Sequence, residues 1–355
     1  MTKFNNILII KLSSIGDVVH ALPFLEVLKN SNPDSRIDWL VEEEASQLIS
    51  GHPAINRVII SKRKAWEKEI LNPLKFTKVF SEAVGFYKEL RSSSYDIVVD
   101  LQGLFRSGFL TALSRGKRRI GMSGGREGAS FFLKEPAVPV DYDQHAIDRY
   151  LNVAAYLGCN TIKFKGEIPV FEPDIKLADE LLCPDTKKNN MIAINPMAKW
   201  KTKLWEPNKF SELASGLQKN LNCRIIFTGS SQDRPVIDKM IKQMGNAAGP
   251  VNLAGRTSLK ELAYLYSRCS VLVCTDTGPM HIAAAMGCSV VALFGPTSPL
   301  RTGPYGTGHR VIRSGIDCSP CFKKECDDTK CMKEITVNMV ADAVKSISPF
   351  PATTS

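Results

Sequence analysis

Short runs of β-branched and apolar residues alternate with longer stretches of helical spacing, and this alternation constrains the fold more than any other feature of the chain. The runs expected to form strands cover residues 7–10, 37–41, 96–100, 191–194, 224–227, 271–274 and 290–294. Strands separated in this way by helices pair in parallel, with helices covering both faces of the sheet. The sequence therefore predicts an α/β fold built on parallel sheets.

The chain is long enough for two domains of ordinary size, because it has 355 residues. The strand pattern lapses between residues 171 and 190, where a short helical stretch is followed by a polar, turn-rich segment. We expect an N-terminal domain over residues 1–172, a linker over 173–190, a C-terminal domain over 191–347 and a flexible tail over 348–355. The loops that follow strands, in a cleft between the domains, are the expected site.

Composition and charge narrow the function classes. The chain is 44% hydrophobic and 23% charged, as globular proteins are. Its formal net charge of +10 favours an anionic partner, which leaves nucleic acid, a phosphorylated membrane surface and a phosphate-bearing substrate open. No apolar run approaches the roughly 20 residues that span a bilayer, and residues 1–6 lack a secretory pattern. We therefore expect a cytoplasmic protein.

The loop after the first predicted strand reads Lys-Leu-Ser-Ser-Ile-Gly-Asp over residues 11–17. Gly16 lets the backbone approach a ligand, and Asp17 lies at a helix N-terminus, where the helix dipole favours an ionised carboxylate. Such a carboxylate can accept a proton from a sugar hydroxyl. The alternative is that Asp17 only caps its helix.

A second candidate loop follows the run 271–274. It contains Asp276, Thr277, Gly278 and His281, and the start of the small, apolar helix expected over residues 282–286 offers N–H groups suited to a pyrophosphate. The loop matches neither G-x-G-x-x-G nor the P-loop, which argues against redox nucleotide binding and ATPase chemistry. The alternative is a capped core helix with a buried histidine.

Two further loops after strands carry charge. Residues 195–205 include Lys199, Lys201 and Lys203, which can neutralise a departing diphosphate or simply form a solvated basic loop. Asp233, after the run 224–227, suits ribose hydroxyls.

Basic residues also gather in the first half, at residues 62–64, 115–119 and Arg126. Between the first two groups, aromatic and aliphatic residues are interspersed with lysines over residues 66–87. An anionic, amphiphilic acceptor or a membrane surface would suit this mixture. A solvated helix face is the alternative.

The ten cysteines fall into two groups. Six stand singly among apolar or small residues and are expected in the core: Cys159, Cys183, Cys223, Cys269, Cys274 and Cys288. The other four form the pattern C-x2-C-x4-C-x4-C and are either a structural zinc site or, as we favour, reduced thiols or a disulfide: Cys318, Cys321, Cys326 and Cys331. No Asp-x-Asp signature lies in a loop suited to a catalytic metal.

Four motifs stand in a specific order along nearly the whole chain. They are the loop at 11–17, Asp-Trp-Leu-Val-Glu-Glu at 38–43, Asp-Leu-Gln-Gly-Leu at 100–104 and Asp-Thr-Gly-Pro-Met-His at 276–281. Together they resemble glycosyltransferase family 9, the lipopolysaccharide heptosyltransferases. The Val-Glu-Glu segment and residues 144–146 are most similar to heptosyltransferase I. Ala198-Lys199 stands where that type commonly has paired threonines, and the clustered cysteines are typical of other branches.

The resemblance implies a GT-B architecture, with two Rossmann-like parallel-sheet domains facing across a cleft, the acceptor side first. It implies Asp17 as the general base. The implied acceptor-binding residues are Lys11, Ser13, Ser14, Gly16, Arg63, Lys64, Arg126 and His145. The implied donor-binding residues are Lys199, Lys203, Asp233, Asp276, Thr277, Gly278 and His281.

The function that follows from this resemblance is transfer of L-glycero-D-manno-heptose from ADP-heptose to the Kdo-lipid A inner core, with inversion and without metal or cofactor. The implied enzyme is a monomer at the cytoplasmic face of the inner membrane. Heptosyltransferase II, or another family 9 transferase with a different acceptor or nucleotide sugar, is the alternative. A nucleic-acid-binding protein is favoured only by the net charge, because the lysines lie largely in strand-end loops and beside an apolar helix.

Overall fold

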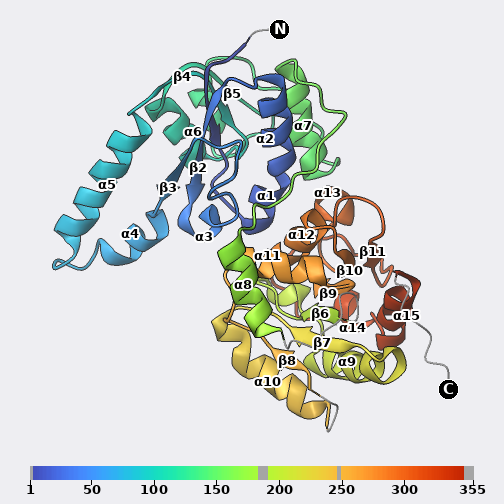
Figure 1. Ribbon diagram of the computed structural model, residues 1–355. Helices are drawn as coiled ribbons and strands as arrows, with labels where there is room; N and C mark the ends of the chain where they lie inside the picture. The colour runs from blue at the N-terminus through green and yellow to red at the C-terminus, as the bar shows by residue number, and fades with distance from the viewer. Residues whose placement is uncertain (1–2, 183–190, 246–248, 348–355) are drawn as a thin grey trace. The chain divides into compact units, whose positions relative to one another are not determined.

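The chain forms two compact units, Met1–Pro169 and Val170–Ser355, in a computed structural model that describes residues 3–182, 191–245 and 249–347. Each unit contains one sheet with helices packed on it (Figure 1). All the strand pairs in both sheets are parallel. The predicted parallel α/β organisation is confirmed.

The first unit has a five-stranded sheet in the order β3-β2-β1-β4-β5. Its strands are β1 (Asn6–Ile10), β2 (Arg36–Glu42), β3 (Arg57–Ser61), β4 (Ser94–Asp100) and β5 (Arg115–Gly121). Its helices are α1 (Ile15–His20), α2 (Leu22–Ser31), α3 (Glu43–Ser46), α4 (Arg63–Glu69), α5 (Phe76–Leu90), α6 (Phe105–Leu113), the 3-10 helix η1 (Ala129–Phe132) and α7 (Ala146–Tyr156).

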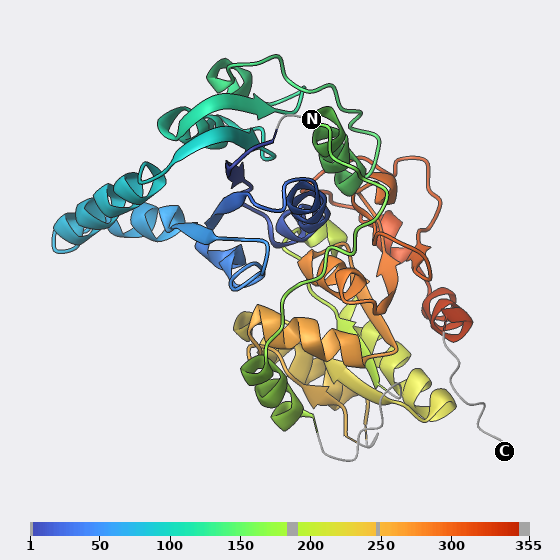
Figure 2. The same cartoon turned by 45° about the horizontal axis from the view of Figure 1, so that its top comes forward.

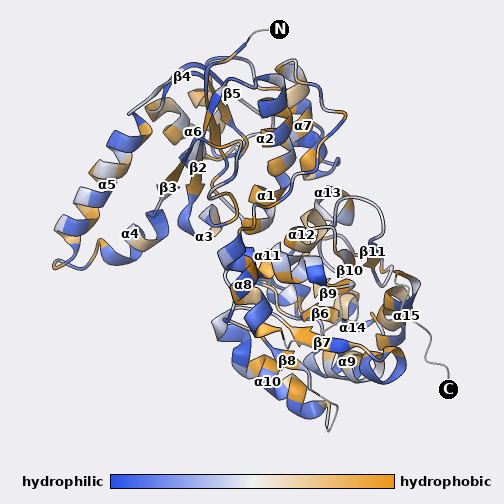
Figure 3. Cartoon of the chain, viewed as in Figure 1, coloured by the Kyte–Doolittle hydropathy of each residue, from blue (hydrophilic) through white to orange (hydrophobic). Residues whose placement is uncertain are grey.

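Apolar side chains hold the helices of the first unit to its sheet. Residues 7–10 of β1 are fully buried. On one face, Phe86 of α5 and Leu110 and Leu113 of α6 pack against the strands. Helices α1, α2 and α7 pack together on the other face. Figure 3 shows the apolar colour concentrated in the strands between these layers.

The second unit has a six-stranded sheet in the order β11-β10-β9-β6-β7-β8. Its strands are β6 (Met191–Asn195), β7 (Arg224–Phe227), β8 (Val251–Asn252), β9 (Val271–Thr275), β10 (Ser289–Leu293) and β11 (Arg310–Ile312). Its helices are α8 (Glu172–Leu181), η2 (Lys201–Lys203), α9 (Pro207–Leu221), η3 (Ser231–Asp233), α10 (Arg234–Gln243), α11 (Leu259–Arg268), α12 (Gly278–Ala285), α13 (Pro299–Thr302), α14 (Lys330–Lys333) and α15 (Val337–Ile347).

Trp205 connects the loop after β6 to the core of the second unit. Its ring is buried, and its Nε1 donates a hydrogen bond to the Ile335 carbonyl at 3.0 Å. The hydroxyl of Thr202 in the same loop donates to the Lys323 carbonyl at 2.9 Å. The lysines of this loop therefore stand on a segment held at two points.

All seven predicted runs form strands, and four strands were not predicted. The additional strands are β3, β5, β8 and β11, which lie at the edges of the two sheets. Edge strands pair on one side only and accept polar residues, as the Arg-Gly-Lys-Arg-Arg sequence of β5 illustrates. Such a sequence lacks the apolar run by which a central strand is found.

The division between the units falls at Pro169 and Val170. Residues 173–181, expected in a linker, belong to α8, which packs on α11 of the second unit. The Tyr264 hydroxyl donates to the Asp179 carboxylate at 3.1 Å, which adds a polar contact between these helices. Residues 183–190, with Cys183, and the expected tail 348–355 lie outside the described residues. Across the described ranges, no helix is long and apolar enough to cross a bilayer.

Candidate functional site

Each sheet has a point at which the strand order reverses. This point lies between β1 and β4 in the first unit and between β6 and β9 in the second. Ligands of open parallel sheets bind beyond the carboxyl ends of the strands at such a point. The loops after these four strands carry Asp17, Lys203 and Asp276, so the main predicted residues lie where this rule places a site.

Lys11 is the buried cation of the first loop, with a side chain that is 4% exposed. Its Nζ donates to the Leu101 carbonyl at 3.1 Å and lies 4.0 Å from Oδ1 of Asp17. Burial lowers the pKa of this lysine, but its neighbours Tyr150, Asp17 and Asp100 outweigh burial and raise the pKa above the ordinary value. The lysine is therefore charged at neutral pH, and it stabilises negative charge on Asp17.

Asp17 combines a structural contact with exposure to solvent. Its Oδ2 accepts hydrogen bonds from the backbone nitrogen of Ser14 at 2.9 Å and from the Ser14 hydroxyl at 3.0 Å, which forms a capping box on α1. The side chain is still 37% exposed. The capping contact is present, and it leaves an accessible carboxylate at the carboxyl end of β1. Gly16, one residue earlier, is buried in the same helix.

The Asp-Leu-Gln-Gly-Leu motif shapes the neighbouring loop after β4. The buried carboxylate of Asp100 accepts hydrogen bonds from the backbone nitrogens of Gln102 and Gly103, at 2.8 and 3.1 Å, and from the Ser107 hydroxyl at 2.8 Å. Burial raises the pKa of Asp100 despite these bonds. Gln102 Oε1 in turn accepts from the backbone nitrogen of Ser13 at 3.2 Å. The loop of β4 therefore positions the loop of β1.

Glu42, at the end of β2, gathers three cations around a buried carboxylate that is 3% exposed. Its Oε1 lies 3.1 Å from Arg63 and 3.3 Å from Arg106, and its Oε2 lies 3.5 Å from Lys64. Arg106 also donates to the Ser13 hydroxyl at 3.0 Å. A continuous set of polar contacts therefore runs from the predicted acceptor residues of α4 to the loop that precedes Asp17.

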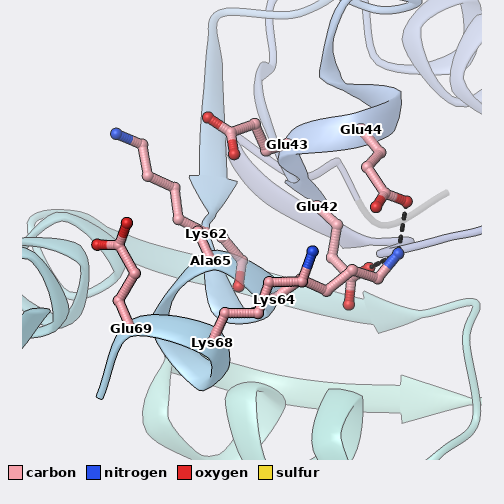
Figure 4. Close-up of a pocket in the computed structure, with 9 residues that line it drawn as sticks. Glu42, Glu43, Glu44, Lys62, Lys64, Ala65, Lys68 and Glu69 are labelled. Atoms are coloured by element: carbon pink, nitrogen blue, oxygen red, sulfur yellow. Dashed lines mark hydrogen bonds and ion pairs between the residues drawn. The ribbon is translucent and has the colours of Figure 1, made fainter. Parts of the chain in front are cut away.

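A pocket of about 260 Å³ adjoins this cluster at the ends of β2 and β3. Figure 4 shows that its walls carry lysine and glutamate side chains, with Lys64 directed to Glu42 and Glu44. Lys62 and Lys68 line the same pocket. Because both charge signs are present, the pocket suits a ligand with anionic groups and hydroxyls.

The other two predicted acceptor residues lie elsewhere in the first unit. Arg126 is exposed, and its backbone nitrogen donates to the Gly103 carbonyl at 2.9 Å. His145 caps the start of α7, where its Nδ1 accepts from the Ile147 nitrogen at 3.2 Å. Its ring stands edge-on to that of His20, with centroids 5.0 Å apart. Arg63 and Lys64 thus meet at one carboxylate, whereas Arg126 and His145 occupy separate segments.

In the second unit, Lys203 and Asp276 form an ion pair at the carboxyl ends of β6 and β9. Lys203 Nζ lies 2.5 Å from Asp276 Oδ2, and the side chains are only 16% and 7% exposed. The Thr297 hydroxyl donates to the same oxygen at 2.7 Å. Lys203 Nζ also lies 4.5 Å from the centroid of the Trp200 ring. These contacts fix one ammonium group at the point where the strand order reverses.

The start of α12 lies directly after Asp276. Thr277 is the N-cap residue, and its side chain makes no capping hydrogen bond. Gly278 and Pro279 form the first helical positions, where proline is tolerated because its missing N–H has no partner in the helix. His281 is buried in the first turn. A helix start that its own N-cap side chain does not close is suited to an anion.

Lys199 and Asp233 differ in how they are held. Lys199 is exposed in the loop after β6. Asp233 Oδ2 accepts hydrogen bonds from the nitrogen and the hydroxyl of Ser230, both at 2.7 Å, so this carboxylate caps η3. Their roles toward a donor stay predictions.

The clustered cysteines are free thiols. Cys331 is buried, Cys318 and Cys326 are exposed and Cys321 is half-buried. Burial raises the pKa of Cys331, and the other three thiols act in the same direction. No group of three or more metal-ligating side chains is arranged for a metal among the residues that the structure describes. The five described single cysteines are buried, as predicted: Cys159, Cys223, Cys269, Cys274 and Cys288.

Comparison with known proteins identifies the family. The sequence profile of glycosyltransferase family 9 (heptosyltransferase) matches residues 84–332. The chain belongs to this family. It is 30% identical to lipopolysaccharide heptosyltransferase 1 of Pseudomonas aeruginosa over 323 residues, which cover 90% of this chain and 87% of that protein. Relatives named heptosyltransferases 2 and 3 match at 27% and 26% identity.

Solved structures agree with this assignment. A family 9 glycosyltransferase from Veillonella parvula has a TM-score of 0.82 and 25% identity, with 98% of each chain covered. E. coli heptosyltransferase WaaC with ADP-2-deoxy-2-fluoro heptose has a TM-score of 0.76 and 26% identity, with 97% of this chain and 100% of that chain covered. This family 9 chain is therefore a glycosyltransferase of GT-B architecture, and both predictions are confirmed.

Three residues that shape this family 9 site escaped the sequence interpretation: Glu42, Gln102 and Arg106. Glu42 and Gln102 lie inside the motifs at 38–43 and 100–104 that carry the family resemblance, and that position was the available signal. Arg106 lies two residues beyond the second motif, where no spacing rule marks it. Its two partners are far away in sequence, so only the fold reveals it.

Replacing Glu42 by Gln should lower the free energy of unfolding. The change removes the shared anion of Arg63, Lys64 and Arg106 while it keeps the side-chain shape. We expect a loss of about 1–2 kcal/mol in urea unfolding, less than for a fully buried pair because the cations are about one-third exposed. Glu44→Gln is the control, since Glu44 is 64% exposed and pairs with Lys64 at the surface. Equal effects of the two changes would contradict the gathering role of Glu42.

Proposed function

We propose that this family 9 enzyme transfers L-glycero-D-manno-heptose from ADP-heptose to the Kdo-lipid A inner core of lipopolysaccharide. The first unit takes the acceptor, and the second takes the nucleotide sugar. The reaction inverts the anomeric carbon and needs neither metal nor cofactor. The observation that carries the proposal is the accessible Asp17 carboxylate beside buried, charged Lys11.

The chemistry is a single displacement. Asp17 accepts the proton of the acceptor hydroxyl as its oxygen forms a bond to the anomeric carbon. The bond between that carbon and the diphosphate oxygen breaks, and ADP leaves with the bonding electrons. Lys203 and the start of α12 stabilise the charge that develops on ADP. Asp276 acts as a positioning residue, because it holds the ammonium group of Lys203 in place.

The acceptor side rests on the basic groups around Glu42. Arg63 and Lys64 lie at the start of α4, next to a pocket that Lys62 and Lys68 also line. These cations suit the anionic groups of an inner-core acceptor. Because Arg106 joins Glu42 to Ser13, the basic cluster and the base are parts of one hydrogen-bonded framework.

ADP-heptose is supported as the donor by the WaaC structure with ADP-2-deoxy-2-fluoro heptose. A type II transferase, or a family 9 enzyme with another acceptor or nucleotide sugar, is the second candidate, because relatives of types 1, 2 and 3 match at similar identity. A product assay with Kdo-lipid A and with cores that already carry one heptose distinguishes the types. We further propose a cytoplasmic monomer that associates peripherally with the inner membrane.

The Asp17→Asn variant should fold normally, bind donor and lose kcat by at least about 100-fold, the lower range for a general base. Asparagine still accepts the hydrogen bonds of Ser14, so the cap survives while the base is lost. The comparison variant Ser14→Ala removes the hydroxyl contact and keeps the carboxylate. Ser14→Ala should lose less activity than Asp17→Asn. If Asp17→Asn stays within a few-fold of the wild type, Asp17 is only a cap.

The two substrates should be separable by mutation. Arg63→Gln with Lys64→Gln should raise the KM for the acceptor by about tenfold, mostly at low salt because exposed charges are screened. Donor affinity should hardly change. Asp276→Asn should do the reverse, since Lys203 loses its fixed position. Calorimetric ADP titration and acceptor kinetics measure both effects; equal damage to donor binding by the two changes would rule out the division of labour.

Transfer should survive EDTA, because lysine and helix N–H groups, and not a metal ion, neutralise the charge of the diphosphate. The measurement is initial rate and circular dichroism before and after chelation. Loss of activity that magnesium or manganese restores, with folding unchanged, would refute the metal-free reaction. Loss accompanied by unfolding would instead reveal a structural metal at the clustered cysteines.

A further inference from the structure

The hairpin of α4 and α5 extends from the sheet of the first unit (Figures 1 and 2). Its turn carries exposed apolar side chains. We call residues 70–80 the hairpin apex. Leu71 and Leu74 in its turn are 88% and 91% exposed. Phe76 and Phe80, one helical turn apart on α5, are 51% and 62% exposed, and their rings stack with centroids 6.4 Å apart. Large apolar side chains gathered so openly mark an interaction surface.

The apex has little part in holding the unit together. Helix α4 buries no residue, and α5 buries only Val79 and Leu90. Trp66 links the two helices nearer their base, where its Nε1 donates to Glu82 at 2.8 Å and its ring packs edge-on against Phe86. The leucines of the turn therefore stand on a braced hairpin without contributing to its core.

Charged side chains surround the apolar residues. Lys68, Lys75 and Lys78 are exposed at or beside the apex, where Lys75 pairs with Glu69 at 2.7 Å and Lys78 lies 3.9 Å from both Glu69 and Glu82. Residues 62–90 contain seven basic and four acidic residues, so the hairpin is basic as a whole. Lysine stems lie along apolar surface while their ammonium groups reach phosphates, and clusters of them attract anionic lipid.

Together these features fit a lipid surface better than a protein groove. An apex of eleven residues falls short of the roughly 20–30 residues that each partner contributes to a stable protein interface. Two exposed leucines at the tip of a hairpin with net positive charge instead suit an interfacial anchor. We propose that the hairpin apex docks the first unit on an anionic bilayer, with Leu71 and Leu74 inserted below the headgroups and the lysines on lipid phosphates. This inference deepens the peripheral location proposed above and rests on it.

The docking would place the acceptor cluster close to the membrane. Arg63 and Lys64 lie at the other end of α4 from the apex. Seven residues at about 1.5 Å rise per residue separate the two ends by roughly 10 Å. A lipid-linked sugar that projects from the bilayer would then meet the basic cluster without leaving the membrane.

The test is flotation of the full chain with phosphatidylcholine vesicles that do or do not contain phosphatidylglycerol. The wild type should bind only the anionic vesicles, and salt should weaken binding. Leu71→Ser with Leu74→Ser should reduce affinity by about tenfold or more, since each leucine loses its apolar transfer. Ile162→Ser is the matched control, because Ile162 is 82% exposed in the same unit but outside the hairpin. It should bind as the wild type does.

A second pair tests the charges. Lys75→Gln with Lys78→Gln should weaken binding several-fold and reduce its salt dependence, since about 1 kcal/mol per lysine near an anionic surface corresponds to roughly fivefold. Lys219→Gln with Lys239→Gln, exposed in the second unit, is the control. Equal loss in both pairs would show that net charge acts without the hairpin, which overturns the proposal.

Transfer to a water-soluble acceptor fragment separates this proposal from the proposed function. The leucine variant should keep wild-type transfer there and lose it on acceptor embedded in vesicles. If the wild type transfers sugar but does not bind vesicles, or if the leucine variant still floats, the docking surface is wrong and the function stands. If the wild type binds the vesicles but transfers no sugar, the proposed function is wrong and the docking surface stands. If the leucine variant differs from the wild type in sedimentation, and therefore in oligomeric state, but not in flotation, the apex binds a second copy of the chain. That result also overturns the proposal.

Discussion

Parallel pairing of β1 with β4, and of β6 with β9, is the constraint on which the rest of the structure depends. It brings the carboxyl ends of neighbouring strands to one edge of each sheet, although the loops involved are about 90 residues apart in the first unit and more than 70 in the second. The carbonyl of Leu101 can then accept from Lys11, and Asp276 can pair with Lys203. Neither contact would exist without that pairing.

Both units place a lysine beside an aspartate at this edge, and the differences between the pairs argue for different roles. Asp276 is 7% exposed and lies 2.5 Å from Lys203, with a threonine hydroxyl on the same oxygen. A carboxylate so enclosed is committed to its partner. Asp17 is 37% exposed, and its Oδ1 lies 4.0 Å from Nζ of Lys11. The looser, wetter carboxylate is the one that can take a proton from a substrate.

The sequence predicts the interior strands and the loops that follow them better than it predicts the edge strands and the tertiary contacts. The seven interior strands are buried on both faces and consist of apolar runs, so they could be found. The edge strands β5, β8 and β11 are short or polar and could not, whereas β3 carries the apolar run Val-Ile-Ile and was missed. Asp17 and Asp276 follow interior strands, so their loops could be located from the sequence. The role of Arg106 comes from its contacts with Ser13 and Glu42. These contacts depend on tertiary packing, which the local sequence pattern does not predict.

Capping and catalysis are compatible at Asp17, and the capping contact helps the proposed chemistry. A free aspartate samples several rotamers, and a base must be held in one of them for proton transfer to be efficient. Ser14 holds Oδ2 with two hydrogen bonds, which fixes the carboxylate plane. Lys11 Nζ lies 4.0 Å from the other oxygen and places a positive charge beside it. Asp17, in the first turn of α1, is thereby oriented by the N-cap residue of its own helix, and the same geometry that satisfies the helix N-terminus presents the carboxylate at the end of β1.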